Sequence, residues 1–136
     1  MRSPHRWQVQ SLSCSDQIVP ATSAVVAAMA EQGYKERDIF ETTLIISEAL
    51  MNAVMHGNRA NPRKRVVMSY RVAFDRVLID IQDEGPGFDP ASVQDPTLPN
   101  NLAKPGGRGL LLMRCYSTWL RFNRRGNRVM LCKVKE

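Results

Sequence analysis

The segment SEALMNAVMHGN, residues 47–58, combines an apolar helix pattern with polar side chains that recur at one-turn spacing. Glu48 and Asn52 are four residues apart, so they share one helical face, and His56 continues that face. A carboxylate beside a carboxamide oxygen can hold a hydrated magnesium ion, and the carboxylate can also act as a base. Taken alone, the pair is more typical of a solvated helix surface than of a site.

This segment is the second half of a predicted helix. Asp38 is the expected N-cap, with Glu41 three residues later as its capping-box partner, and Gly57 is expected to end the helix. The predicted apolar stripe, widened by Ile46 and Leu50, consists of Phe40, Leu44, Ser47, Met51 and Val54.

The flanking segments predict strands and two further helices. Alternating apolar residues predict hairpin strands over 66–74 and 77–82, and a second hairpin over 118–123 and 128–134. The other expected elements are an edge strand over 6–14 and helices over 18–32 and 109–116. This order predicts an α+β fold, a two-layer α/β sandwich with the helices on one face of a mixed, mostly antiparallel sheet.

A second candidate site segment follows the strand over 77–82. Asp83 continues the face of Ile79 and Ile81, which is expected to meet the helices, and the chain then enters the turn Gly85-Pro86-Gly87-Phe88. A carboxylate facing the core needs hydrogen-bond donors, and an exocyclic amine such as that of adenine is a suitable one. Gly87 would let the backbone approach a flat ring, although an ordinary turn with a capping Asp has the same pattern.

A third segment, GGRGLLLMR at residues 106–114, opens a predicted helix with glycines. Backbone N–H groups at such a helix start can face an anion at the positive end of the helix dipole. Arg108 and Lys104 can supply charge to phosphates. The spacing fits neither a Walker-type loop nor a Rossmann fingerprint, and a flexible hinge is the alternative interpretation.

Composition sets outer limits on the function. The 136 residues fit one domain, 1–136, and no apolar stretch approaches the length needed to span a bilayer. The N-terminus lacks the apolar segment of a secretory signal, so we expect a cytoplasmic protein without a membrane partner. The net charge of +6 attracts polyanions, but the basic clusters lack interleaved aromatics, so a nucleic-acid partner is not expected.

Together, the three segments resemble the Bergerat-type ATP-binding fold of DNA gyrase, the ninety-kilodalton heat-shock chaperone, histidine kinases and MutL proteins. The motifs are Glu48-x-x-x-Asn52, Asp83-x-Gly85-x-Gly87-Phe88 and Gly107-x-Gly109-Leu110. They occur in the order typical of that superfamily, and the resemblance covers roughly residues 38–135. Within it, SEALMNAVMHGN and GGRGLLLMR are most similar to the anti-sigma-factor serine/threonine kinases.

The resemblance implies ATP and Mg²⁺ as cofactors and gives each motif residue a role. Glu48 is implied as the general base, and Asn52 as the Mg²⁺ ligand, with Glu48 reaching the ion through water. Asp83 is implied to accept from the adenine amino group. Gly107 and Gly109 are implied to line the phosphates beneath a lid over residues 89–105. The full implied ATP-binding set is Asn52, Asp83, Gly85, Gly87, Phe88, Lys104, Gly107, Arg108, Gly109 and Leu110.

The implied function is a protein serine/threonine kinase that phosphorylates or sequesters a regulatory protein. Its implied partners are a sigma factor, an anti-sigma antagonist with an acceptor serine, or both, and a homodimer stays open. Two alternatives remain: a nucleotide-responsive binding module without phosphotransfer, and a detached histidine-kinase catalytic domain. The last would need a phosphoacceptor histidine on a dimerising hairpin, and neither His5 nor His56 is predicted to lie in one.

Overall fold

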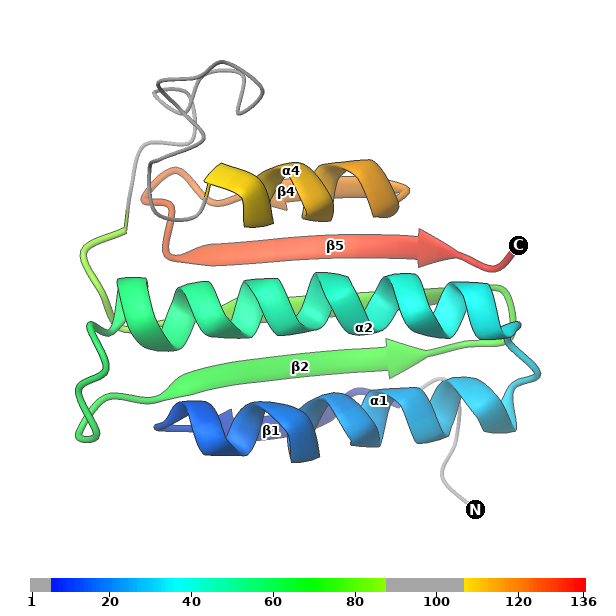
Figure 1. Cartoon of the computed structure of the whole chain (residues 1–136), viewed down its shortest axis with the longest axis horizontal. Coiled ribbons are helices and arrows are strands. Elements are labelled where there is room, and N and C mark those ends of the chain that lie inside the picture. Colours follow the sequence, from blue (N-terminus) through cyan, green and yellow to red (C-terminus); the bar gives the residue numbers. More distant parts are fainter. Residues whose placement is uncertain (1–5, 88–106) are drawn as a thin grey trace.

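The protein folds into a five-stranded antiparallel sheet with helices packed on one of its faces (Figure 1). The computed structural model describes residues 6–87 and 107–136. The elements in chain order are β1 (Gln8–Leu12), η1 (Ser15–Gln17), α1 (Ile18–Glu31), α2 (Glu36–Met51), η2 (Asn52–Gly57), β2 (Val66–Val72), β3 (Arg76–Gln82), α4 (Gly107–Tyr116), β4 (Trp119–Phe122) and β5 (Arg128–Val134).

The strands lie in the order β1-β2-β3-β5-β4, and each neighbouring pair is antiparallel. The sheet was expected to be mixed and mostly antiparallel, and its described pairings are all antiparallel. Ile79 marks the centre, since it pairs with Tyr70 on β2 and with Leu131 on β5. The expected edge strand is confirmed in β1, and the two predicted hairpins are β2–β3 and β4–β5.

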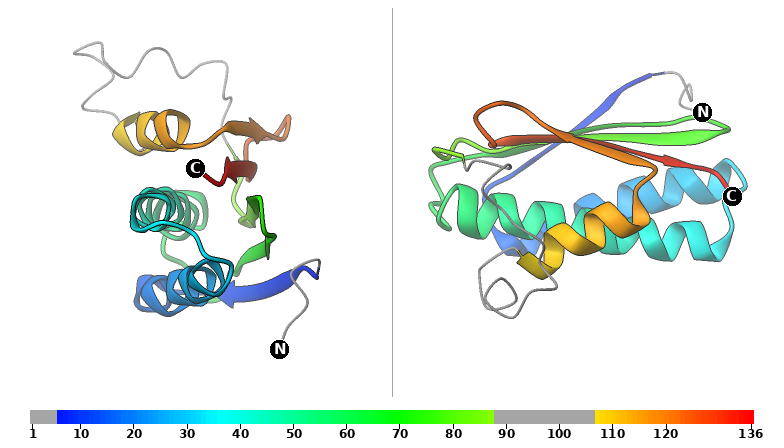
Figure 2. Two further views of the ribbon diagram at one scale, coloured as in Figure 1. Left: turned by 90° about the vertical axis from the view of Figure 1, so that its right-hand side faces the viewer. Right: turned by 90° about the horizontal axis from the view of Figure 1, so that it is seen from above.

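The helices all lie on one face of the sheet, as the view from above in Figure 2 shows. This is the face that carries the alternating buried residues of the strands. On β2 the inward residues Val66, Met68 and Tyr70 are buried, while Val67 between them is exposed. This is the period-two pattern expected of a sheet with one covered face. The helices contribute a second set of fully buried side chains: Val25, Met29, Ile45, Ile46 and Leu50. None of the described helices is long and apolar enough to cross a membrane.

The predicted start and apolar face of α2 are wrong in detail. The helix begins at Glu36 after an extended Lys35, so Asp38 lies inside the first turn, where it accepts a hydrogen bond from the Glu136 amide at 3.0 Å. Phe40 and Met51, expected in the core, are 62% and 42% exposed. The buried face is centred instead on Thr42, Ile45, Ile46, Ala49 and Leu50. Because α2 packs on the sheet between α1 and α4, the neighbouring elements select one of two adjacent apolar stripes.

The last turn of the α2 axis is a π-helix, η2. The Asn58 amide donates to the carbonyl of Ala53, five residues earlier, at 2.8 Å. Gly57 ends this segment as expected, and Arg59 and Ala60 then adopt left-handed conformations with φ of 52° and 56°. Such π segments and left-handed non-glycine residues occur most often where a chain is shaped for function. Here η2 and Arg59 both contribute to the lining of the cavity described next.

Candidate functional site

A cavity of about 340 Å³ opens where α2, η2, β3, α4 and the β4–β5 turn meet. Its volume is in the range of small-molecule sites. The lining from the helices is Ala49, Asn52, Ala53, His56, Gly57, Leu110 and Met113, and from the loops and strands Arg59, Ile81, Asp83, Pro86, Gly87, Phe122, Gly126, Asn127, Arg128 and Val129. Three of the predicted site segments therefore contribute to one cavity.

Asp83 lines the cavity directly after β3, and it is half-buried there. Its Oδ1 accepts a hydrogen bond from the Gly85 amide at 2.8 Å. Burial raises the pKa of the carboxyl group, while the Gly85 hydrogen bond and the positive charges of Lys64 and Arg125 act in the opposite direction. A sheltered carboxylate with free acceptor capacity is suited to a ligand that brings its own N–H donors.

Two glycines let the backbone pack directly around this carboxylate. A Cβ on Gly57 would overlap the Asp83 carboxylate, and a Cβ on Gly85 would overlap the backbone carbonyl oxygen of Gly57. Gly85 was predicted to belong to the site, whereas Gly57 was predicted only to end a helix. The sequence shows the glycine itself but not its contact, because its partner Asp83 lies 26 residues further along the chain.

The turn between β4 and β5 forms a wall that sequence reasoning missed. The Asn123 Oδ1 accepts from the amides of Gly126, Asn127 and Arg128 at 2.8, 3.1 and 3.2 Å, which fixes the turn. Asn127 then exchanges hydrogen bonds with the Asp83 backbone, donating from Nδ2 at 3.4 Å and accepting from the Asp83 amide at 2.9 Å. The sequence predicted this turn as a hairpin only, with no part in the site.

Gly87 lies against the same turn. Its φ is +80°, and a Cβ there would overlap the carbonyl oxygen of Arg125. Both the conformation and the lack of space require glycine. Gly87 was expected to let the backbone approach a flat ring, which stays a prediction; the close neighbour that the structure describes is the β4–β5 turn.

Glu48, Asn52 and Gly109 meet beside the cavity. A Cβ on Gly109 would overlap the Glu48 Oε2 and would lie 3.4 Å from the Asn52 Nδ2. Asn52 lines the cavity, whereas Glu48 and Gly109 are not part of its lining and adjoin it at Asn52. The helix spacing of Glu48 and Asn52 thus places both side chains against the start of α4.

The remaining predicted residues are described only partly. Leu110 is buried at the cavity and Gly107 begins α4. Phe88, Lys104 and the predicted lid over 89–105 lie outside the described residues, and for Arg108 only the helical backbone is described. Within residues 6–87 and 107–136 no three His, Cys, Asp or Glu side chains form a metal-binding group. A divalent cation there would depend on Asn52 and Glu48, ligand phosphates and water, a donor set that suits Mg²⁺.

The raised pKa of Asp83 leads to a prediction about stability. Below its ordinary pKa of 3.8 the carboxyl group is protonated in both the folded and the unfolded chain, so burial carries no ionisation penalty. In the folded chain the pKa of Asp83 is raised, so ionising the carboxyl group costs more free energy there than in the unfolded chain. As pH rises through this pKa, the contribution of Asp83 to the free energy of unfolding therefore falls. Asp83→Asn is therefore expected to gain unfolding free energy relative to the wild type as pH rises above the ordinary carboxyl pKa of 3.8, measured in urea titrations.

The exposed Asp75 provides the matched control, because its hydrogen bond with Arg76 lowers the pKa of its carboxyl group. Asp75→Asn is expected to show the opposite trend, losing stability relative to the wild type as pH rises. A stability difference for Asp83→Asn that does not change with pH would contradict the assigned effect of burial.

Comparison with known proteins shows the family to which the sequence is similar. The family model described as histidine kinase-like ATPase domain matches residues 13–133. The serine/threonine-protein kinase BtrW of Bordetella bronchiseptica is 35% identical over 88 residues, which cover 63% of this chain and 62% of that protein. The serine-protein kinase RsbW of Bacillus licheniformis is 33% identical over 90 residues, which cover 62% of this chain and 56% of that protein.

An anti-sigma F factor of a Geobacillus species matches over a longer stretch. It is 28% identical over 117 residues, which cover 83% of this chain and 77% of that protein. For the two kinases, the matched part of the chain spans less than two thirds of the relative's length.

Proposed function

The chain belongs to the histidine kinase-like ATPase family, and from that premise we propose that it binds ATP with Mg²⁺ and phosphorylates a serine or threonine of a regulatory protein. The observation that carries the proposal is the convergence of distant segments. Asn52, Asp83 and Leu110 line one cavity, and Glu48 adjoins it through Gly109. The names of the relatives, serine/threonine kinases and an anti-sigma factor, support the choice within the family.

The adenine ring is assigned to the Asp83 end of the cavity. There the carboxylate accepts a hydrogen bond from the exocyclic amine, while Ile81 and Met113 provide apolar contact for the ring. The Asp83 Oδ1 is already held by the Gly85 amide, so the carboxylate is oriented before the ligand arrives. A carboxylate at this position favours adenine over guanine, because guanine presents a carbonyl oxygen where adenine presents a donor.

The phosphates are assigned to the other end, at the first turn of α4. The backbone amides near Gly107 and Gly109 have no earlier helical partner, and the helix dipole favours an anion there. Lys104 and Arg108 remain proposed sources of additional positive charge. Asn52 would hold Mg²⁺, which neutralises charge on the phosphates during transfer.

Glu48 is the proposed general base. During transfer, a bond forms between the acceptor hydroxyl oxygen and the γ-phosphorus, and the bond from that phosphorus to the ADP oxygen breaks. The proton of the hydroxyl moves to the Glu48 carboxylate. The absence of a side chain at Gly109 leaves the carboxylate in contact with the start of α4, close to where the γ-phosphate is assigned.

A second candidate function is sequestration of a sigma factor under nucleotide control without phosphotransfer. The name of the Geobacillus relative, anti-sigma F factor, is the observation in its favour. In this case ATP would change only which partner is bound.

One experiment separates the two. The purified chain is incubated with γ-labelled ATP, Mg²⁺ and an antagonist-type protein that carries an acceptor serine. The kinase proposal expects label on that serine and release of ADP. If ATP binds but label reaches none of the acceptors supplied, the kinase proposal fails and the sequestering function is favoured. If ATP does not bind at all, both fail.

A further inference from the structure

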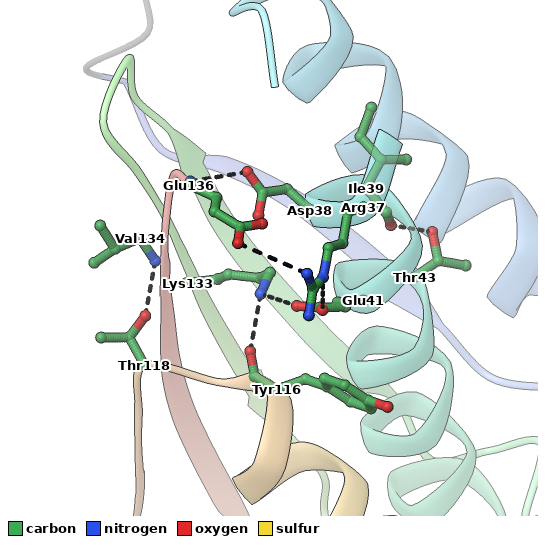
Figure 3. Close-up of polar contacts among 10 residues, drawn as sticks. All are labelled: Arg37, Asp38, Ile39, Glu41, Thr43, Tyr116, Thr118, Lys133, Val134 and Glu136. Carbon is green, nitrogen blue, oxygen red and sulfur yellow. Dashed lines mark hydrogen bonds and ion pairs between the residues drawn. The ribbon is translucent and has the colours of Figure 1, made fainter. Parts of the chain in front are cut away.

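A cluster of charged side chains lies at the opposite end of α2 from Glu48 and Asn52 (Figure 3). Its centre is Lys133, which is only 7% exposed and occupies an inward position of β5, in line with Val129 and Leu131. The Lys133 ammonium donates to the Glu41 Oε2 at 2.5 Å and to the backbone carbonyl of Tyr116 at 3.1 Å. A buried ammonium needs such partners, because an unpaired charge in the core is costly.

The carboxylate partner is itself held in place. Arg37 donates to the other oxygen of Glu41 at 3.1 Å, one helical turn away. The hydrogen bond from Lys133 lowers the pKa of the Glu41 carboxyl group, with Arg37 acting in the same direction, so Glu41 stays ionised at neutral pH. Lys133 therefore joins α2 to β5 through an ion pair with Glu41, and it donates a second hydrogen bond to the end of α4.

The second partner of Lys133, the Tyr116 carbonyl, connects the cluster to the candidate site, because Tyr116 is the last residue of α4. A cation at a helix C-terminus satisfies a carbonyl that lacks a helical partner and interacts favourably with the dipole. Between its ends, α4 is held by the buried side chains of Leu110 and Met113. Such apolar contacts are non-directional, whereas a hydrogen bond to a backbone carbonyl fixes the position of the helix along its axis.

At its other end, α4 lies directly against Glu48 and Asn52. A Cβ added to Gly109 would overlap the Glu48 Oε2 and would lie 3.4 Å from the Asn52 Nδ2. The helix α4 is therefore connected to α2 at two places. Lys133 connects it to Glu41, and Gly109 lies against Glu48 of α2 and Asn52 of η2. A shift of α4 at the Lys133 end moves the start of the helix relative to Glu48.

We infer that Lys133 is a positioning residue for phosphate binding: by holding the Tyr116 carbonyl and Glu41 together, it sets where the N-terminal turn of α4 meets Glu48 and Asn52. The inference rests on the proposed function, since it assumes that the nucleotide phosphates bind at that turn. Lys133 touches neither nucleotide nor acceptor, and it acts through α4.

The test compares ATP–Mg²⁺ with adenosine, which lacks phosphates and depends only on the Asp83 end of the cavity. Lys133→Met keeps an unbranched side chain that is one heavy atom shorter, and it removes the charge and the hydrogen-bond donors. This variant is expected to bind ATP–Mg²⁺ about tenfold more weakly, whereas its affinity for adenosine stays within about twofold of the wild type. Calorimetry measures the first affinity and an NMR titration the second, with thermal unfolding as the check on folding.

Lys135→Met is the matched control, because Lys135 donates to the carbonyl of Gln32 at the end of α1, at 2.7 Å. It removes the same kind of bond from a helix that does not contribute to the cavity lining, so the ratio of ATP to adenosine affinity should not change. If Lys133→Met does not fold, Glu41→Gln provides the same test, because it removes the negative charge that holds the ammonium and keeps an acceptor oxygen.

If folded Lys133→Met has the same ratio of ATP affinity to adenosine affinity as the wild type, the inference is overturned. The proposal that the wild type binds ATP is not affected by that result. A parallel loss of both ligands also overturns it, since that is the effect of a general structural role. If the wild type binds neither ligand, the proposed function fails and the inference fails with it.

Discussion

Glu48→Gln is expected to lower the rate of phosphoryl transfer by about 10²- to 10⁴-fold while ATP affinity stays within about threefold of the wild type. Glutamine keeps the size of the side chain that packs against Gly109, so the start of α4 should not move. It cannot take the proton of the acceptor hydroxyl, because a carboxamide is not basic at neutral pH. Label transfer to the acceptor serine under single-turnover conditions measures the effect.

Glu36→Gln is the control for this substitution. Glu36 is exposed in the first turn of α2, far from the cavity, and the same chemical change there should leave the transfer rate unaltered. Transfer at the wild-type rate by Glu48→Gln would refute the assignment of the base, although ATP binding itself would remain.

Gly85→Ala is expected to have the second large effect, acting on both stability and binding. The added methyl group would overlap the carbonyl oxygen of Gly57, and it would lie 3.0 Å from the Asp83 Oδ1. Since the clash is with backbone, the loop must move, at a cost of about 1–3 kcal/mol in unfolding free energy. Displacement of the carboxylate is expected to reduce ATP affinity by about 10²-fold.

Gly33→Ala is a suitable comparison for this variant. Gly33 has a φ of +77°, so alanine is strained there, but the nearest atom to an added Cβ is the Lys135 Nζ at 3.6 Å. It should lose stability without losing ATP affinity. ATP binding by Gly85→Ala at the wild-type level would show that the loop around Asp83 does not form the adenine site.

The sheet could be predicted from the sequence because its pattern is local. Alternation along β2 and β3 is set by one covered face, and the short turn at Phe74-Asp75, closed by the hydrogen bond from the Ala73 amide to the Arg76 carbonyl, fixes their register. The buried face of α2 could not be predicted in the same way. Its sequence carries two adjacent apolar stripes, and the choice between them depends on α1 and α4, which pack on either side.

Residues of the candidate site that follow short motifs could be proposed from the sequence, whereas residues whose role depends on distant contacts were missed. Of the motif residues, the structure places Asn52, Asp83 and Gly87 in the lining of one cavity, with Glu48 and Gly109 in contact beside Asn52. Gly57 and Asn127 were missed as site residues, because each acts through the Asp83 loop from a distant part of the chain. Lys133 was missed for the same reason, since its partner Glu41 is 92 residues away.

The nucleotide site itself is tested most directly by calorimetric titration of the wild type and Asp83→Ala with ATP–Mg²⁺. We expect the wild type to bind and Asp83→Ala to lose at least about 2 kcal/mol of binding free energy, because a hydrogen bond to a charged, sheltered group is removed. That loss corresponds to an affinity about thirtyfold weaker. No heat of binding with the wild type, or equal affinity in the two proteins, would contradict an adenine nucleotide in this cavity.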